Sequence, residues 1–459
     1  MAANNNNTTF KRNIGTAGQI FIAVATISPV AGVFVNIQGT LGVAGTGMLW
    51  AYLLAAIITW GVAFTYSEMG AMYPYSGGLY SIARNVLGPT LGFVVLMDYL
   101  IQAVFMPATI ALGAAQYFAP LFPSLSLSAL GFIVMLIVTI IALLSISLEA
   151  KFTGFFVVLE ILLMTALTVS SIFHMHQNLS IYTHPTALSS GHDVAATWGL
   201  VITTTAIALF SYNGYDSALN VSEETNATPR KIGLGVVKAA TIAIVFQIIP
   251  IFFMLLATPS VSQLLSSKDP LSFLGATLFG TNASVIFDAA AGFAILNSTL
   301  GVTIQFSRIL YSSARDHVWP SAMSNALQKL QPKTGSPYVA VLVVGIIGLV
   351  MTFFSSFLFD LAFIGVIVVA LYFFIAIAAI VSKIRDRTIE RTYKAPLGYL
   401  FPLLALIGSV FVLTQQSGKS LLISLILFVI GAVYYLTLGR VFARKAYSLD
   451  SHDGIRTNM

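Results

Sequence analysis

The chain has 459 residues, of which 57% are apolar and 8% are charged, and its formal net charge is +6. Soluble domains carry charge on about a quarter of their residues, so water is not the main solvent of this chain. The sequence contains no cysteine. Disulfide bonds, thiolate metal sites and cysteine nucleophiles are therefore excluded, and with them most redox chemistry and most structural zinc sites.

Long apolar stretches recur along the chain. A spanning helix needs about 20 mainly apolar residues to cross a hydrocarbon core of about 30 Å. Such stretches occupy 14–35, 44–66, 90–118, 128–148, 152–173, 196–220, 233–257, 282–313, 337–355, 358–382, 398–415 and 420–443. Their continuous apolarity excludes a membrane barrel, whose strands would alternate over about ten residues. The sequence predicts an all-α membrane protein with about twelve transmembrane helices.

The first apolar stretch does not resemble a cleaved signal peptide. It is long, contains Ser28-Pro29 and lacks a clear cleavage site of small residues. We therefore expect it to stay attached as the first transmembrane helix. Residues 1–13, which precede it, are expected to form a disordered cytoplasmic N-terminus.

The basic residues predict the orientation of the chain. If the N-terminus is cytoplasmic, every Lys and Arg except Lys268 and Lys419 falls in an inner segment or in the C-terminal tail. This distribution follows the positive-inside rule. We expect a multi-pass protein of the plasma membrane with both termini cytoplasmic and a tail at 444–459. The basic residues are spread over short loops, so the positive charge does not indicate a nucleic-acid partner.

Two of the apolar stretches are interrupted at matching depths. The first stretch contains Ser28-Pro29-Val30-Ala31-Gly32, and the sixth contains Phe210-Ser211-Tyr212-Asn213-Gly214. Non-helical backbone deep in a membrane survives only where it lines a cavity, and paired broken helices predict a transporter's binding site. Freed amides favour a carboxylate and freed carbonyls favour an ammonium, so the site suits a zwitterion. Alternatively, Pro29 only kinks its helix and Gly214 only permits close packing.

Four further stretches carry a family pattern. They are the run SEMGAMYPYSGGLY from Ser67 to Tyr80 with Gly88-Pro89, the run from Phe210 to Asp216 with Glu223-Glu224 and Pro229-Arg230, the run Ser307 to Tyr311 with Ala314-Arg315-Asp316 and Pro320, and Lys394-Ala395-Pro396-Leu397-Gly398. Together they resemble motifs of the amino acid, polyamine and organocation (APC) superfamily of secondary transporters. The resemblance extends from about residue 14 to 440.

This resemblance implies a LeuT-like, five-plus-five inverted repeat that operates by alternating access. The repeats would cover about 14–173 and 196–382 within a transport core of 14–382, and two further helices would occupy 398–443. It implies a permease for amino acids, and an amine or polyamine importer or an amino acid exchanger are the alternatives. Asp98-Tyr99 and Ser28-Pro29 are closer to the putrescine-importer branch. The first break reads Val30-Ala31-Gly32 where the family usually has G-[ST]-G.

The resemblance also assigns residues to the substrate site. Tyr99 and Gln102 fall where the family's third helix meets substrate, and Phe210 falls at its aromatic gate. The predicted substrate-binding residues are Ser28, Pro29, Val30, Ala31, Gly32, Tyr99, Gln102, Phe210, Ser211, Tyr212, Asn213, Gly214, Asn297 and Ser298. Ordinary hydrogen bonding between helices would equally explain Asn297 and Ser298.

Carboxylates within the apolar stretches are expected to have a structural or functional role, because each costs about 2.5 to 3.5 kcal/mol at the centre of a spanning helix. Glu160 is expected to take up and release a proton between two access states, and a structural, hydrogen-bonded carboxylate is the alternative. Asp98 is a candidate to contact a substrate amine. Alternatively, it bonds to a neighbouring helix. Transport would use a proton gradient, and sodium coupling or passive exchange stay open.

Charged residues near the predicted cytoplasmic helix ends have two interpretations. They form an inner gate of ion pairs, or they are solvated loop charges. The residues are Glu68, Arg84, Glu223, Glu224, Arg308 and Arg315.

An enzyme is not expected, since no acid, base or metal-ligand motif such as H-E-x-x-H is present. The histidines and Asp193 of the segment 174–195 are irregularly spaced, so we predict no metal site and no cofactor. A substrate-sensing membrane receptor is the alternative from another class. The expected partners are a small amine-bearing solute and the lipid bilayer.

Overall fold

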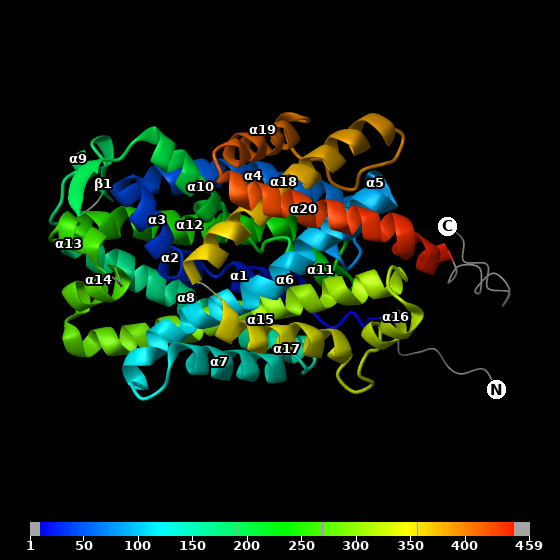
Figure 1. Ribbon diagram of the computed structural model, residues 1–459, viewed down its shortest axis with the longest axis horizontal. Helices are drawn as coiled ribbons and strands as arrows, with labels where there is room; N and C mark the ends of the chain where they lie inside the picture. Colours follow the sequence, from blue (N-terminus) through cyan, green and yellow to red (C-terminus); the bar gives the residue numbers. More distant parts are fainter. Residues whose placement is uncertain (1–9, 190, 268–269, 356, 445–459) are drawn as a thin grey trace.

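The computed structural model describes residues 10–444 except 190, 268, 269 and 356. Residues 1–9 of the predicted disordered N-terminus (1–13) and 445–459 of the predicted cytoplasmic tail (444–459) therefore lie outside the described residues. Within them, helices dominate, and the long ones run mostly along the long axis of the molecule (Figure 1).

Each predicted apolar stretch is occupied by helix, and further short helices lie outside these stretches. In chain order the α-helices are α1 (Thr16–Ile27), α2 (Pro29–Phe34), α3 (Ile37–Ala44), α4 (Met48–Met72), α5 (Gly78–Val86), α6 (Pro89–Phe118), α7 (Leu127–Ile141), α8 (Ile146–Phe173), α9 (Ser180–Thr183), α10 (Trp198–Tyr212), α11 (Ser217–Asn220), α12 (Pro229–Ala257), α13 (Val261–Ser266), α14 (Pro270–Phe279), α15 (Thr281–Arg315), α16 (Ser321–Leu327), α17 (Tyr338–Phe354), α18 (Phe357–Arg385), α19 (Leu400–Thr414) and α20 (Gly418–Tyr434). Short 3-10 segments η1 (Gly45–Gly47), η2 (Ala119–Leu121) and η3 (Ser222–Glu224) join some of them, and the π-helical turn η4 (Tyr435–Gly439) continues α20. The short helices outside the predicted stretches include α5, α9, α13, α14 and α16.

Many of these helices are suited to a bilayer. In the described part of the chain, eight helical segments are long and apolar enough to cross a membrane, and four shorter apolar helices accompany them. The eight are Thr16–Phe34, Ile37–Met72, Pro89–Leu121, Ile146–Phe173, Pro229–Ala257, Val285–Arg315, Phe363–Arg385 and Gly418–Arg444. The chain is thus a multi-pass membrane protein, whereas the count of twelve crossings and the inverted repeat stay predictions.

Two details differ from the sequence-based expectation. The fourth stretch was expected to end near residue 148, but α7 ends at Ile141 and α8 already begins at Ile146. The apolar residues between them hide this turn from an apolarity pattern. The segment 174–195 also contains a small antiparallel hairpin of β1 (Thr186–Ser189) and β2 (His192–Ala195). These four-residue strands have no counterpart in the predicted all-helical pattern.

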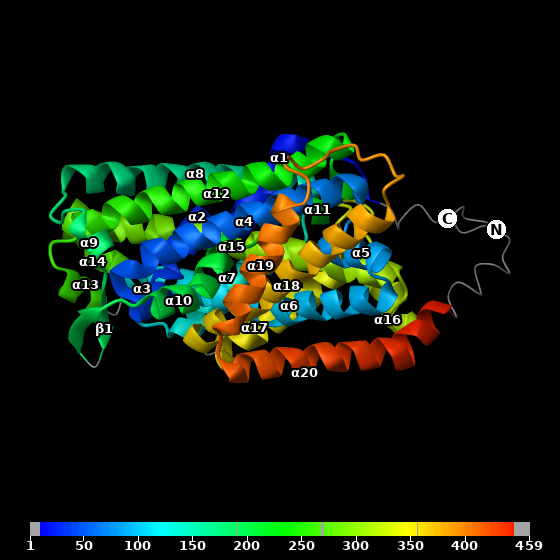
Figure 2. The same cartoon turned by 90° about the horizontal axis from the view of Figure 1, so that it is seen from above.

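The two ends of the bundle differ. The hairpin, α9 and α13 gather at one end, and α16 and both ends of the described chain lie at the other (Figure 1). We call these the hairpin end and the terminal end. Helix α20 runs along the outside of the bundle (Figure 2). Helix α1 packs against α8, α12 and α15, and its second half is buried.

Two glycines bring other backbones close to the buried end of α1. A Cβ on Gly301 of α15 would lie 2.7 Å from the Cα of Thr26, and a Cβ on Gly214 would lie 2.9 Å from the backbone nitrogen of Ile27. The hydroxyl of Ser298 on α15 also donates to the carbonyl oxygen of Thr26 at 3.2 Å. Helix α1 is therefore held at fixed spacing between α15 and the chain that follows α10.

We predict that Gly301→Ala destabilises the protein by about 1–3 kcal/mol, because the new methyl group overpacks the contact with Thr26. Gly42→Ala on α3 is the matched control. Gly42 is also helical, and its Cβ would meet no atom within 4 Å, so the change gives only the helix-propensity gain. Thermal unfolding of the purified protein in detergent measures both. Equal melting temperatures for the two variants would contradict this packing.

Candidate functional site

The first break is a single residue, Ser28, between α1 and α2. Ser28 has a φ of 45°, an uncommon conformation for a residue other than glycine. Its hydroxyl accepts a hydrogen bond from the amide of Ala31 at 3.0 Å, so it caps α2, which begins at Pro29. Proline suits this first position because its missing N–H would have no helical partner. The interruption was predicted over 28–32, but Val30 to Gly32 are helical again.

The second break follows α10. Phe210, Ser211 and Tyr212 form the last turn of this helix, and α11 begins only at Ser217. Between them Gly214 has a φ of 120°, which only glycine adopts without strain. The predicted break at 210–214 is therefore displaced toward 213–216. The reason is local, since the glycine and not the aromatic residues before it sets the backbone conformation.

The two breaks border one small buried cavity. Its lining residues are Thr26, Ile27, Ala31, Gly32, Val35, Asn36, Met106, Ile110, Phe210, Ser211, Asn213 and Ser298. The cavity volume is about 10 Å³, about the room that the centre of one water molecule needs. Six predicted site residues therefore meet here, namely Ala31, Gly32, Phe210, Ser211, Asn213 and Ser298. All six are buried in this conformation.

The cavity is bordered by a hydrogen-bond network that sequence reasoning missed. Tyr52 Oη donates to the carbonyl oxygen of Gly32 at 2.8 Å and lies 3.0 Å from Ser211 Oγ. Asn36 Nδ2 donates to Ser211 Oγ at 2.7 Å, and Gln247 Nε2 donates to the Ser211 carbonyl at 2.9 Å. Side chains of α4 and α12 thereby satisfy carbonyls near both breaks. In the sequence these side chains are recognisable only as polar residues near or within apolar stretches, a pattern that does not identify their hydrogen-bond partners.

Tyr99 and Gln102 do not line this cavity but lie in an adjoining polar cluster, in which Gln102 Oε1 accepts from Asn213 Nδ2 of the cavity wall at 3.5 Å. Tyr99 Oη donates to Asp216 Oδ2 at 2.6 Å, and Gln305 Nε2 donates to the same oxygen at 3.0 Å. Gln102 Nε2 donates to Asp98 Oδ1 at 2.7 Å, one turn away on the same helix. All five side chains of the cluster are buried. The cluster joins α6 and α15 to the chain after the second break.

Glu160 lies beside the first break. Its Oε2 accepts from the Ser28 hydroxyl at 2.7 Å, and its Oε1 accepts from Asn297 Nδ2 at 3.3 Å. The Glu160 side chain is fully buried. Neither hydrogen-bond partner in the described part of the chain carries a charge. The same hydroxyl that caps α2 therefore bonds a buried carboxylate, which links the ionisation of Glu160 to the backbone of the break.

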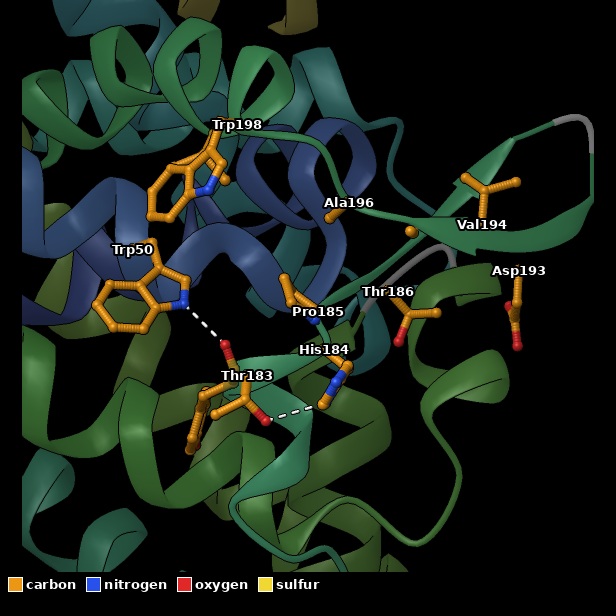
Figure 3. A pocket seen from close by; sticks show the side chains of 12 residues that line it. Trp50, Thr183, His184, Pro185, Thr186, Asp193, Val194, Ala196 and Trp198 are labelled. Atoms are coloured by element: carbon orange, nitrogen blue, oxygen red, sulfur yellow. Dashed lines mark hydrogen bonds between the residues drawn. The ribbon is translucent and has the colours of Figure 1, made fainter.

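A larger cavity lies elsewhere, at the hairpin end, and has a volume of about 660 Å³. Figure 3 shows Trp50 and Trp198 on one side of it and the hairpin residues Asp193 and Val194 on the other. None of the predicted substrate-binding residues lines it. Among the described residues, no three His, Asp or Glu side chains come close enough together to hold a metal ion.

Ion pairs join helices at the terminal end. The pairs and their distances are Arg84–Asp316 at 2.5 Å, Arg315–Glu223 at 2.7 Å, Lys383–Glu68 at 2.7 Å, Arg391–Glu68 at 2.9 Å, and Arg308 with Glu149 at 3.0 Å and Glu224 at 3.2 Å. Each of these six contacts includes at least one of the six residues that the sequence suggested for an inner gate, and Arg391 adds a second cation to Glu68. These residues are thus paired rather than solvated individually.

Comparison with known proteins places the chain among membrane transporters. Residues 14–436 of the chain match the sequence pattern of a protein family described as amino acid permease. The branched-chain amino acid permease BcaP of Lactococcus lactis is 24% identical over 427 residues, covering 88% of this chain and 89% of the relative. The low-affinity putrescine importer PlaP of Escherichia coli is 26% identical over 409 residues, covering 85% and 86%. The serine/threonine exchanger SteT of Bacillus subtilis is 26% identical over 439 residues, covering 90% and 95%.

We predict that Tyr52→Phe lowers the stability by about 1–3 kcal/mol, because it leaves a buried carbonyl without its donor while the ring stays in place. Tyr75→Phe is the control, since the Tyr75 side chain is 49% exposed and surface changes usually stay within about 0.5 kcal/mol. Thermal unfolding in detergent compares the two. If Tyr52→Phe melts with the parent, the network around Ser211 does not stabilise the break.

Proposed function

This chain belongs to the amino acid permease family, and on that premise we propose that it is a secondary active transporter of amino acids that works by proton-coupled symport. It operates in the plasma membrane by alternating access, with both termini cytoplasmic. Twelve transmembrane helices, ten of them in a five-plus-five inverted repeat, belong to the same proposal. Its support is that each of the twelve predicted stretches is occupied by helix.

One observation carries the proposal: the two helix breaks border the same buried cavity. Breaks in two helices that are far apart in the sequence have no stabilising value of their own, since each forfeits helical hydrogen bonds in a region without water. A solute that binds there would meet backbone groups and the aromatic side chain of Phe210. Phe210 can close over the solute, and its ring face attracts an ammonium by a cation–π contact of about 0.5 to 2 kcal/mol.

Glu160 is the proposed coupling residue. A buried carboxylate with neutral partners is strongly disfavoured while it is ionised, and a proton removes that charge. Because Ser28 bonds both Glu160 and the amide of Ala31, loss of the proton changes the hydrogen bonding of the first break. Proton release and rearrangement of the cavity are thereby coupled through one hydroxyl group.

A second candidate is the import of a small amine. The amides of Ala31 and Gly32 already bond to Ser28, at 3.0 Å to its side chain and 2.8 Å to its carbonyl, so a substrate carboxylate finds fewer free donors. Two buried carboxylates, Asp98 and Asp216, are present in the adjoining cluster, and carboxylates attract amines. The relative named as a putrescine importer is consistent with this candidate.

Uptake into proteoliposomes decides between these candidates. A panel of amino acids, amines and polyamines is tested with an inward proton gradient, with a sodium gradient and with neither. We expect an amino acid to accumulate under the proton gradient alone. Accumulation of amines only would favour the second candidate, and saturable binding without uptake would indicate a receptor instead of a transporter.

We predict that Glu160→Gln abolishes accumulation driven by the proton gradient but keeps exchange of internal for external substrate. Glutamine reproduces the shape of the protonated acid and cannot release a proton. Glu390→Gln at an exposed position is the matched control and should transport like the parent. Counterflow and gradient-driven uptake in the same liposomes measure both properties. Full proton-driven uptake by Glu160→Gln would assign coupling to another group.

A further inference from the structure

Three ionisable side chains meet in the interior, away from Glu160. Arg308 lies on α15, Glu149 lies in the first turn of α8, and Glu224 ends the 3-10 segment η3. The side chains of Arg308 and Glu149 are 0% exposed, and that of Glu224 is 2% exposed. Arg308 is thus a buried cation with two carboxylates, each from a different element.

The two carboxylates contact Arg308 differently. Glu224 binds with both oxygens, at 3.2 Å to Nε and 3.4 Å to Nη2. Glu149 uses only Oε2, at 3.0 Å to Nη2. The other oxygen of Glu149, Oε1, is buried and has no hydrogen-bond partner in the described part of the chain. Bidentate hydrogen bonding stabilises an ionised carboxylate beside arginine, and Glu224 makes such a contact with Arg308.

In the described part of the chain, the surrounding elements supply no further buried cation to this cluster. Helix α1 has no ionisable residue, and Lys151 on α8 is exposed. On α12 the basic residues Arg230, Lys231 and Lys238 are exposed as well. Glu223 precedes the cluster and pairs with Arg315 at 2.7 Å. Burial raises the pKa of Glu224, and the contact with Arg308 opposes this rise.

The charges therefore do not balance if both glutamates are ionised. One cation and two carboxylates leave one negative charge in a region closed to water, and such a charge is far more costly than a neutral acid. We propose that Glu149 is a second proton-binding site, which carries its proton while the terminal end of the transporter is closed. The proton removes the excess charge and leaves the Arg308–Glu224 pair intact.

The site links proton binding to opening of this end, and in this respect the inference rests on the proposed alternating access. The cluster joins α8, α15 and the segment before α12, and opening would separate these elements and admit water to Glu149. An ionised Glu149 is stable in water, so the open form releases the proton that the closed form holds. Closure is therefore favoured at low pH, and opening is favoured as the pH rises.

A cysteine reporter can measure this opening because the chain contains no cysteine. Ser222 is 3% exposed, and its hydroxyl has no hydrogen-bond partner among the described residues, so Ser222→Cys changes little. The rate of maleimide labelling is measured in nanodiscs between pH 6 and pH 8. Dividing it by the rate for Ser321→Cys, at an exposed position, removes the pH dependence of the thiol itself.

We expect the labelling ratio of the parent reporter to rise several-fold with pH, with about tenfold per pH unit as the limit for one proton. Glu149→Gln, which mimics the protonated acid, should keep the ratio low at every pH. Glu224→Gln should raise the labelling ratio at low pH, because the bidentate contact with Arg308 is lost. A flat profile in the parent, or a pH dependence that survives Glu149→Gln, would overturn the proposal. The assay needs neither substrate nor transport, so its result is independent of the uptake experiments.

Discussion

Backbone N–H and C=O groups that lose their helical partners inside a membrane need other hydrogen-bond partners, and this requirement determines the contacts around the two helix breaks. At the first break Ser28 caps the following helix with its own hydroxyl. Nearby, Ser298 donates to the carbonyl of Thr26, and Gln247 donates to that of Ser211. These donors come from helices that pack around α1 and α10. The breaks thus depend on the surrounding bundle for their hydrogen-bond partners, and both border the same small cavity.

Buried carboxylates occur in three different settings, two of them beside the breaks. Glu160 bonds neutral groups beside Ser28, Asp216 bonds a tyrosine and a glutamine, and Glu149 shares an arginine with a second glutamate. Each setting stabilises the charged form to a different extent, so the three acids need not bind and release protons together. A transporter can use such a series to couple successive structural steps to protons.

Much of this architecture follows from local sequence rules. Pro29 and Gly214 have backbone restrictions of their own, so they mark breaks without knowledge of the fold, although the bounds of the non-helical segments shifted by up to four positions. Tyr99 and Gln102 were placed by family resemblance, and the structure puts them in the cluster of Asp98 and Asp216 instead of on the cavity wall. Partners such as Tyr52, Asn36 and Gln247 could not be named, because hydrogen bonds between distant helices depend on how the helices pack.

The most direct test of the shared cavity is a cryo-EM structure of the protein with a saturating, transported substrate. We predict density for the substrate between the first break at Ser28 and the second break at 213–216, with the Phe210 ring over it. Density confined to the cavity beside Trp50 and Trp198, with the space between the two breaks still closed, would contradict the central claim.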